Sequence, residues 1–221
     1  MNTDLHSESL SAGAQTLARQ IGDADWSEEF YLAGSAAMAL HLGHRPVSNL
    51  DLMSPTQRLR PPDRRDVLGE LLAIDPDVRV ETARDGYLYA RSETGIGVRF
   101  FYYPYPLIDP VSTLAQLEVA SLADLGLMKL AAIISRGTRR DFVDLYLMCR
   151  DLPFASLLER APQKFGHVRD FPLQALKGVS DLSLVDGEPM PALTSALEWS
   201  TIESWVREVV HTSGARAVGL K

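Results

Sequence analysis

The sequence predicts an α/β protein, of the α+β type, in which a mixed β-sheet flanked by helices is followed by a C-terminal helical region. Three observations lead to this fold class. Strand-like and helix-like segments alternate over the first half of the chain, and from Ser121 onward the periodic segments are helical and separated by prolines. In addition, 46% of the 221 residues are hydrophobic and 23% are charged, which is enough apolar material for one large or two small domains with a packed core.

Five short runs bounded by turn residues predict the strands of the sheet. They cover residues 30–33, 49–53, 78–83, 87–91 and 98–103. The first run is apolar and aromatic and stops at Gly34, which is typical of a buried strand. Asp85–Gly86 and the glycines at 95 and 97 supply the two turns that separate the last three runs.

Helices are predicted where apolar residues recur with helical spacing. The segments are 10–21, 36–42, 63–74, 121–136, 139–145 and 199–206. The change of pattern near residues 105–115 indicates a sheet-containing domain over residues 1–110 and a helical region over residues 111–221. Within these parts, residues 1–10 are expected to be flexible and residues 212–221 to be loose.

The charge and cysteine content narrow the class of protein. Twenty-nine acidic and 22 basic side chains give a formal charge of −7, so any contact with nucleic acid must involve a local basic patch. The single cysteine, Cys149, excludes an intrachain disulfide and a zinc site made of several thiolates, which favours a reducing compartment. The acidic first residues do not resemble a secretory signal, and no apolar run reaches the ~18–20 residues of a membrane span. We therefore expect a soluble, cytoplasmic protein without a membrane partner.

The first candidate site is a glycine and a small hydroxyl residue, Gly34–Ser35, followed across a short helix by Asn49-Leu50-Asp51. A Gly-Ser pair at a strand-to-helix turn lets backbone amides approach phosphate oxygens closely. Because alternate strand residues share a face, Asn49 and Asp51 are expected to project together toward that phosphate. Two carboxylates there would hold a divalent metal, although one strand aspartate is more often a surface residue.

Lys129 is the second candidate, because it falls within the apolar stripe of the predicted helix 121–136 and away from Asp124 and Ser135. A lysine on a core-facing stripe requires an anionic partner or a wet cleft. Its other interpretation is a side chain that extends from the edge of the core to solvent.

The third candidate is the pair Asp141 and Asp144, which lie one helical turn apart in the segment that begins at Arg139. They share a face with Leu145 and Met148, which favours drawing at least one acid toward the interior. The alternative is that Asp141 caps the helix and Asp144 pairs with an arginine.

Together these segments resemble the nucleotidyltransferase toxins of the AbiEii/AbiGii abortive-infection type, in the DNA polymerase β-like nucleotidyltransferase superfamily. The matching blocks are 31–45 with 49–52, 125–136 around Lys129, and 140–145, with a weaker match at 199–206. The order and spacing of these blocks make the resemblance more specific than any single block.

The resemblance implies a nucleotidyltransferase-type sheet and a set of roles. In this family the Gly-Ser turn contacts the nucleotide phosphates, an Asp-x-Asp pair binds metal, a lysine holds the triphosphate and a helical aspartate is the candidate base. Carried over to this sequence, the nucleotide-binding residues are Gly34, Ser35 and Lys129, and the catalytic residues are Asp51, Lys129, Asp141 and Asp144. Mg²⁺ is the implied cofactor and a nucleoside triphosphate the implied substrate or ligand. We expect Gly34–Ser35, Asp51 and Lys129 to line one cleft.

Two departures from the family pattern concern the metal. Asn49 stands where the first acid is expected, and the strand 98–103 contains no carboxylate, although many members place another acid there. An amide oxygen can ligate Mg²⁺ but adds no negative charge, so weak Mg²⁺ binding at Asp51 and Asn49 is expected.

The resemblance implies NTP-dependent nucleotidyl transfer to RNA or protein, by the toxin of a toxin–antitoxin pair with a cognate antitoxin. The alternative is a non-catalytic nucleotide- or partner-binding module with a degenerate site. Asn49 and the acid-free strand favour the module, whereas Asp51, Lys129 and Arg140–Asp141 favour the enzyme.

Overall fold

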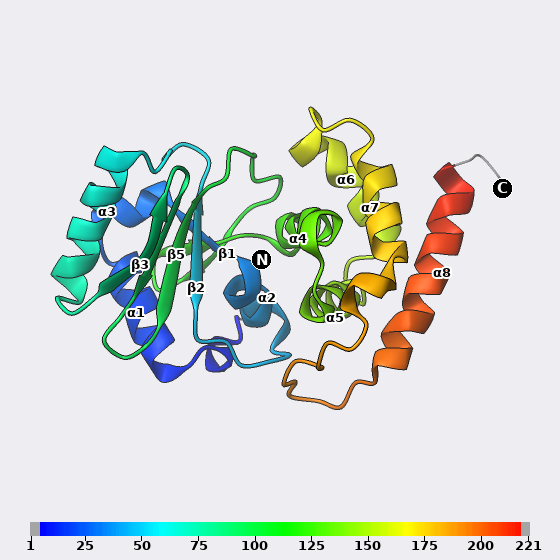
Figure 1. Ribbon diagram of the computed structural model, residues 1–221, viewed down its shortest axis with the longest axis horizontal. Helices are drawn as coiled ribbons and strands as arrows, with labels where there is room; N and C mark the ends of the chain where they lie inside the picture. The colour runs from blue at the N-terminus through cyan, green and yellow to red at the C-terminus, as the bar shows by residue number, and fades with distance from the viewer. Residues whose placement is uncertain (1–4, 218–221) are drawn as a thin grey trace. The chain divides into compact units, whose positions relative to one another are not determined.

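The computed structural model describes residues 5–217, which form two compact units divided after Ser121. The first unit contains a mixed sheet with helices, and the second contains helices (Figure 1). The predicted fold class is therefore confirmed, and each unit is described below by itself.

A seven-stranded sheet forms the centre of the first unit, in the order β3-β4-β5-β2-β1-β7-β6. The strands are β1 (Tyr31–Ala33), β2 (Leu50–Ser54), β3 (Arg79–Arg84), β4 (Tyr87–Arg91), β5 (Gly97–Tyr102), β6 (Ser112–Leu114) and β7 (Leu117–Val119). Strand β2 pairs parallel with β5 and antiparallel with β1, and β1 pairs parallel with β7. With these directions, the C-terminal end of β1 lies beside the N-terminal ends of β2 and β5.

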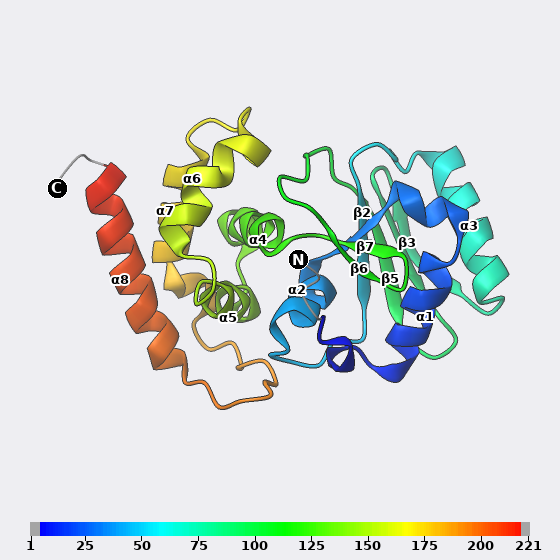
Figure 2. The same cartoon turned by 180° about the vertical axis from the view of Figure 1, so that it is seen from behind.

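The helices of the first unit lie on both sides of this sheet. They are α1 (Ala12–Gly22), α2 (Gly34–Leu42) and α3 (Pro61–Ile74), with short 3₁₀ turns at Ser7–Ser9 and Asp25–Glu29. Figures 1 and 2 both show α1 and α3 on one side and α2 on the other. Alternate strand residues such as Leu32, Leu52 and Phe100 are fully buried, and the Phe100 ring lies 5.2 Å from that of Phe30. One face of the central strands is therefore core.

The second unit is a helical bundle. Its helices are α4 (Leu122–Arg136), α5 (Arg139–Met148), α6 (Phe154–Phe165), α7 (Phe171–Ser180) and α8 (Trp199–Ala217), with a 3₁₀ turn at Leu182–Val185. Helix α4 packs against α5, α6 and α7. On α8, Ile202 and Val206 are buried, and the Trp205 ring contacts the rings of Tyr146 and Phe154. These contacts attach the last helix to the bundle.

Three expectations about the ends and the boundary differ from the structure. The division falls after Ser121 rather than at residues 105–115, because β6 and β7 extend the sheet through Val119. Residues 5–10 are not loose, since the His6 amide donates to the Leu40 carbonyl and Leu10 forms a bridge with Val47. The segment 212–217 is helical, while 1–4 and 218–221 lie outside the described residues.

Candidate functional site

The Gly34–Ser35 turn and Asp51 come together in the first unit. Gly34 begins α2 directly after β1 with a φ of +59°, and Asp51 on β2 lies opposite Ala33 in the register. A Cβ atom on Gly34 would lie 2.4 Å from Asp51 Oδ2, which is closer than two such atoms can approach. Glycine is therefore required at position 34 both for its backbone conformation and for the close approach of the carboxylate.

Helix α2 starts in a way that suits an anion. Its N-cap residue, Ala33, has no side-chain acceptor for the first amides of the helix, and Ser35 occupies the second position half-buried. Backbone N–H groups at a helix start, together with the helix dipole, favour a phosphate. The predicted phosphate-binding turn thus has the local geometry that it requires.

Arg99 is the site residue that the sequence analysis missed. It lies on β5 directly beside Asp51 in the parallel register, and its Nε is 2.6 Å from Asp51 Oδ1. The Asp51 side chain is 12% exposed and that of Arg99 is 34% exposed, so the ion pair lies at the edge of the core. The signal was present in the sequence, because Arg99 interrupts an apolar and aromatic run on the strand where an acid was sought.

Asn49 is also engaged with β5. It lies just before β2, and its Oδ1 accepts a hydrogen bond of 3.0 Å from the Gly97 amide. Of the two expected metal ligands, one is therefore an amide held by the backbone and the other is a carboxylate neutralised by Arg99.

These residues do not fit a resident Mg²⁺ ion. Divalent cations prefer several oxygen ligands with net negative charge, and here Asp51, Arg99 and Asn49 sum to no net charge. Among the residues that the structure describes, no group of three or more histidine, cysteine, aspartate or glutamate side chains is placed to hold a metal. The first unit presents the glycine-led start of α2 beside an ion pair with no net charge.

Lys129, Asp141 and Asp144 form a buried ionic cluster in the second unit. Lys129 Nζ lies 2.9 Å from Asp141 Oδ1 and 2.8 Å from Asp144 Oδ2, and the three side chains are at most 9% exposed. Thr138 reinforces the cluster, because its hydroxyl and its backbone amide both donate to Asp141 Oδ2. Lys129 thus has the anionic partner that its place on the apolar stripe requires, and its convergence with Asp51 stays a prediction.

The charges within the cluster keep Lys129 and Asp141 ionised. Burial alone would lower the pKa of Lys129, but the neighbouring carboxylates outweigh it and raise that pKa. Burial alone would raise the pKa of Asp141, but Lys129 and Thr138 outweigh it and lower that pKa. At neutral pH Lys129 and Asp141 are therefore both charged, and Asp144 Oδ2 lies 2.8 Å from the Lys129 ammonium group.

A second buried ion pair contradicts the placement of Asp124 on the polar face of the helix 121–136, away from its apolar stripe. Asp124, expected on the polar face of its helix, is fully buried and lies 2.8 Å from Lys164 Nζ on α6. The expectation was wrong because α6 supplies a cation from within its own apolar stripe, where Lys164 follows Leu157 and Ala161 with helical spacing. The reasoning used for Lys129 would have found Lys164 as well.

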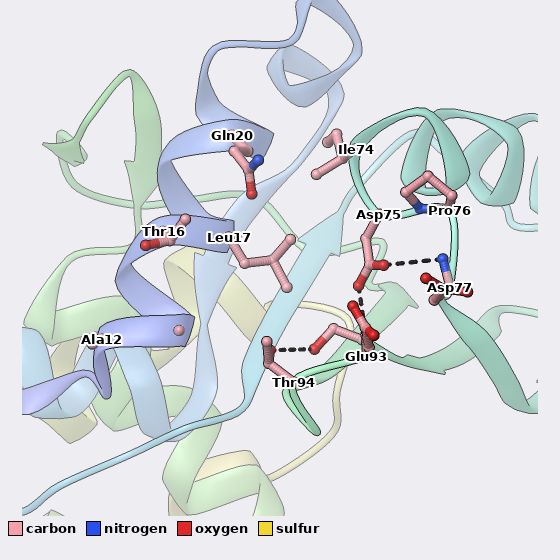
Figure 3. A pocket seen from close by; sticks show the side chains of 12 residues that line it. Ala12, Thr16, Leu17, Gln20, Ile74, Asp75, Pro76, Asp77, Glu93 and Thr94 are labelled. Atoms are coloured by element: carbon pink, nitrogen blue, oxygen red, sulfur yellow. Dashed lines mark hydrogen bonds between the residues drawn. The ribbon is translucent and has the colours of Figure 1, made fainter.

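A cavity of about 490 Å³ in the first unit lies apart from these groups (Figure 3). It is bordered by α1, the end of α3 and the turn before β5, and includes Asp75, Asp77 and Glu93. The Asp75 carboxylate accepts from the amides of Asp77 and Glu93, as the dashed lines in Figure 3 show. Asp75 therefore orders the two turns that meet at the cavity, and the cavity contains none of the predicted site residues.

The family model for the AbiEii nucleotidyl transferase toxin of type IV toxin–antitoxin systems matches residues 15–204. This match covers most of the chain and includes both units. The chain belongs to the AbiEii nucleotidyl transferase toxin family. The family assignment confirms the resemblance read from the sequence and supports a transferase at the coarse level.

One relative is similar over part of the chain. An uncharacterised protein of Aquifex aeolicus, aq_aa25, is 32% identical over 130 residues, which are 55% of this chain and 58% of that protein. The chain thus spans somewhat more than half of that relative's length.

Two solved structures share the fold. A putative nucleotidyltransferase from H. pylori has a TM-score of 0.57 at 16% identity and covers 94% of each chain. MenT4, the nucleotidyltransferase toxin Rv2826c of Mycobacterium tuberculosis H37Rv, has a TM-score of 0.52 at 18% identity over 92% of this chain and 85% of its own. No helix in the described part of the chain is long and apolar enough to cross a membrane.

Proposed function

We propose that this AbiEii-family protein is the toxin of a toxin–antitoxin pair and transfers a nucleotide from a nucleoside triphosphate to RNA in the cytoplasm. The observation that carries the proposal is the start of α2, where Gly34 leaves room for the Asp51 carboxylate beside uncapped helix amides. That arrangement suits the phosphates of a nucleotide more than any other ligand class. A cognate antitoxin is the expected protein partner.

The proposed reaction is an in-line displacement at the α-phosphate. The acceptor hydroxyl oxygen forms a bond to the α-phosphorus, the bond from that phosphorus to the bridging oxygen of the β-phosphate breaks, and pyrophosphate leaves with the negative charge. The Gly34–Ser35 turn binds and orients the phosphates, and Lys129 is proposed to neutralise the triphosphate. The resemblance to the family makes Asp141 the proposed acceptor for the hydroxyl proton.

A second candidate function is a non-catalytic module that binds a nucleotide or a partner. The ion pair between Arg99 and Asp51 favours it, because a guanidinium occupies the place beside Asp51 where a metal or a further acid is expected. The hydrogen bond from Gly97 to Asn49 favours it for the same reason.

One experiment separates the two functions. The full-length protein is incubated with each α-³²P-labelled nucleoside triphosphate, Mg²⁺ and an RNA pool, and label in RNA is measured on a denaturing gel. We expect incorporation, and we expect Asp51→Asn to lower it, because the variant removes the carboxylate that holds Arg99 beside the Gly34–Ser35 turn. Asp85→Asn is the matched control, since Asp85 is an aspartate of the same unit with an 89% exposed side chain.

Each outcome decides between the candidates. Nucleotide binding without incorporation into RNA or into any protein would support the non-catalytic module. Label in protein rather than RNA would keep the transfer reaction and replace the acceptor.

A further inference from the structure

The face of β3, β4 and β5 that carries Arg99 combines arginines with aromatic rings. The register places Tyr89 beside Arg99, Tyr87 beside Phe101, and Arg91 beside Gly97. Strand β3 continues the same rows, because Arg79 pairs with Arg91 and Arg84 pairs with Tyr87. We call this set the arginine–aromatic face; its members are Arg79, Arg84, Tyr87, Tyr89, Arg91, Arg99 and Phe101.

This face is accessible, whereas the opposite face of β4 and β5 carries buried core residues. Every residue of β3 is exposed, and the rings of Tyr87, Tyr89 and Phe101 are half-buried. The alternate residues Leu88, Ala90, Val98 and Phe100 are buried and belong to the core. The large aromatic side chains thus lie on the accessible side of the sheet, where they are not needed to fill the core.

The arginines are ordered by the rings. The Arg84 guanidinium lies 4.9 Å from the Tyr87 ring centroid, and that of Arg91 lies 5.5 Å from the Tyr89 ring centroid. The Arg84 guanidinium, held against its ring, keeps edge donors for phosphate and an outer plane for stacking on a base. The donors of Arg91 are used within the protein, by Glu81, the Gly95 carbonyl and the Tyr89 hydroxyl, so Arg91 fixes the Tyr89 ring in place. Side chains ordered before binding lose less conformational entropy when a ligand arrives.

The charge of the face contrasts with the rest of the unit. Residues 1–121 contain seventeen acids, ten arginines and no lysine, yet the face brings four arginines together against Asp51 and Glu81. Glu81 pairs with Arg91 and Asp51 pairs with Arg99, so Arg79 and Arg84 add the net positive charge. This is the local basic patch that an acidic protein needs to contact nucleic acid.

We propose that the arginine–aromatic face binds a single-stranded segment of RNA, with bases stacked on the rings and phosphates held by the arginines; this inference rests on the proposed transfer to RNA. Stacking on aromatic side chains is possible for unpaired bases, whereas a duplex keeps its bases covered. The four strands from β3 to β2 span about 14 Å, room for a short single-stranded segment. Arg99 belongs to this face and to the ion pair with Asp51, so a bound strand would extend to the phosphate-binding turn.

The test measures RNA binding in the absence of nucleoside triphosphate. The full-length protein is titrated into a fluorescein-labelled, unstructured RNA of about twelve nucleotides, and fluorescence anisotropy gives the dissociation constant. We expect Tyr89→Ala to weaken binding by roughly tenfold, as the loss of one stacked base would. Tyr102→Ala is the matched control, because Tyr102 is a half-buried tyrosine on β5 beneath Arg58 but on the opposite face. It should change binding by less than about twofold.

A second variant removes charge without touching a ring. Arg84→Gln should reduce the slope of log affinity against log salt by about 0.7, the value for one phosphate contact to a single strand. This measurement keeps the proposal testable should Tyr89→Ala fail to fold. Arg58→Gln should leave the slope unchanged.

Three results would overturn the proposal. They are equal effects of Tyr89→Ala and Tyr102→Ala, equal affinity for the matching duplex, and binding to DNA of the same sequence more than about tenfold tighter than to RNA. Failure of the proposed function can be told apart from failure of this inference. A protein that binds RNA through this face but never incorporates label would support the RNA-binding face and contradict the transfer reaction.

Discussion

In the first unit Asp51 pairs with Arg99 across two interior strands of the sheet, whereas in the second unit Lys129 pairs with Asp141 and Asp144 inside a helical bundle. The Arg99 side chain is one-third exposed, and its pair joins two neighbouring strands. The side chains of the helical cluster are nearly inaccessible, and the cluster joins α4 to α5. Both clusters contain residues that the family pattern marks as functional, but their surroundings give them different energetic weight.

The difference in burial predicts a difference in how each cluster tolerates substitution. Replacing Arg99 has an intermediate cost in stability, because water reaches a third of its side chain but little of the Asp51 carboxylate beside it. Removing one charge from the buried helical cluster costs more, because the charges that remain lose their partner in a low-dielectric interior. We therefore expect the first unit to tolerate substitutions that tune binding and the second to resist them.

The largest expected effect follows from removing the buried cation. Lys129→Met leaves two carboxylates without their shared partner and should lower the free energy of unfolding by about 3–5 kcal/mol. Urea denaturation in a Trp26→Phe background measures it, since Trp199 and Trp205 then report on the second unit. Lys177→Met, an exposed lysine on α7, should change the value by less than about 0.5 kcal/mol.

Acid pH provides the control for this prediction. The pKa of Asp141 lies below its ordinary value of 3.8 in the folded protein, so its contribution to stability is present above pH 3.8. That contribution disappears as the pH falls through the lower folded-state pKa. The difference between Lys129→Met and the unsubstituted protein should therefore shrink below pH 3.8, and a difference that stays constant with pH would contradict the assigned ion cluster.

A smaller effect is expected from rebuilding a metal site in the first unit. Asn49→Asp with Arg99→Gln places two carboxylates two residues apart on one strand and removes the competing guanidinium. Isothermal titration should then show Mg²⁺ binding at least about tenfold tighter than in the unsubstituted protein, which we expect to bind weakly. Asn49→Asp alone is the comparison, because it leaves Arg99 paired with Asp51. Micromolar Mg²⁺ affinity of the unsubstituted protein would show that an amide and a paired carboxylate suffice.

Much of this architecture could be predicted because local patterns agree with the final packing. The strand before Gly34, the helix after it and the three strands between residues 79 and 102 all have the turn residues that their connections require. The hairpin of β6 and β7 was missed, since its strands have three residues each and its turn uses Ala115 and Gln116 with positive φ instead of glycine.

The site was harder to predict, because its chemistry depends on pairs between distant segments. The sequence indicates that Lys129 needs an anion but not which one, and it gives no register between β2 and β5. Without that register, Arg99 has no connection to Asp51. The absence of an acid on β5 was visible in the sequence, whereas the presence of a cation aimed at the remaining acid was not.

The smallest expected effect tests the contrast between the Asp51–Arg99 pair and the buried Lys129 cluster. Arg99→Gln alone removes the one-third exposed member of the pair and takes that cation away from the buried Asp51, so it should lower the free energy of unfolding by about 1–3 kcal/mol, less than Lys129→Met. Urea denaturation at low and high salt measures this cost, with the exposed Arg140→Gln as the control of the same type. Salt screens exposed charges and hardly reaches buried ones, so 1 M salt, at a screening length of about 3 Å, should reduce the Arg99→Gln cost and leave that of Lys129→Met unchanged. A salt-independent cost for Arg99→Gln, as large as that of Lys129→Met, would mean that the Asp51–Arg99 pair is a structural element of the core and not a surface on which ligand charge can be exchanged.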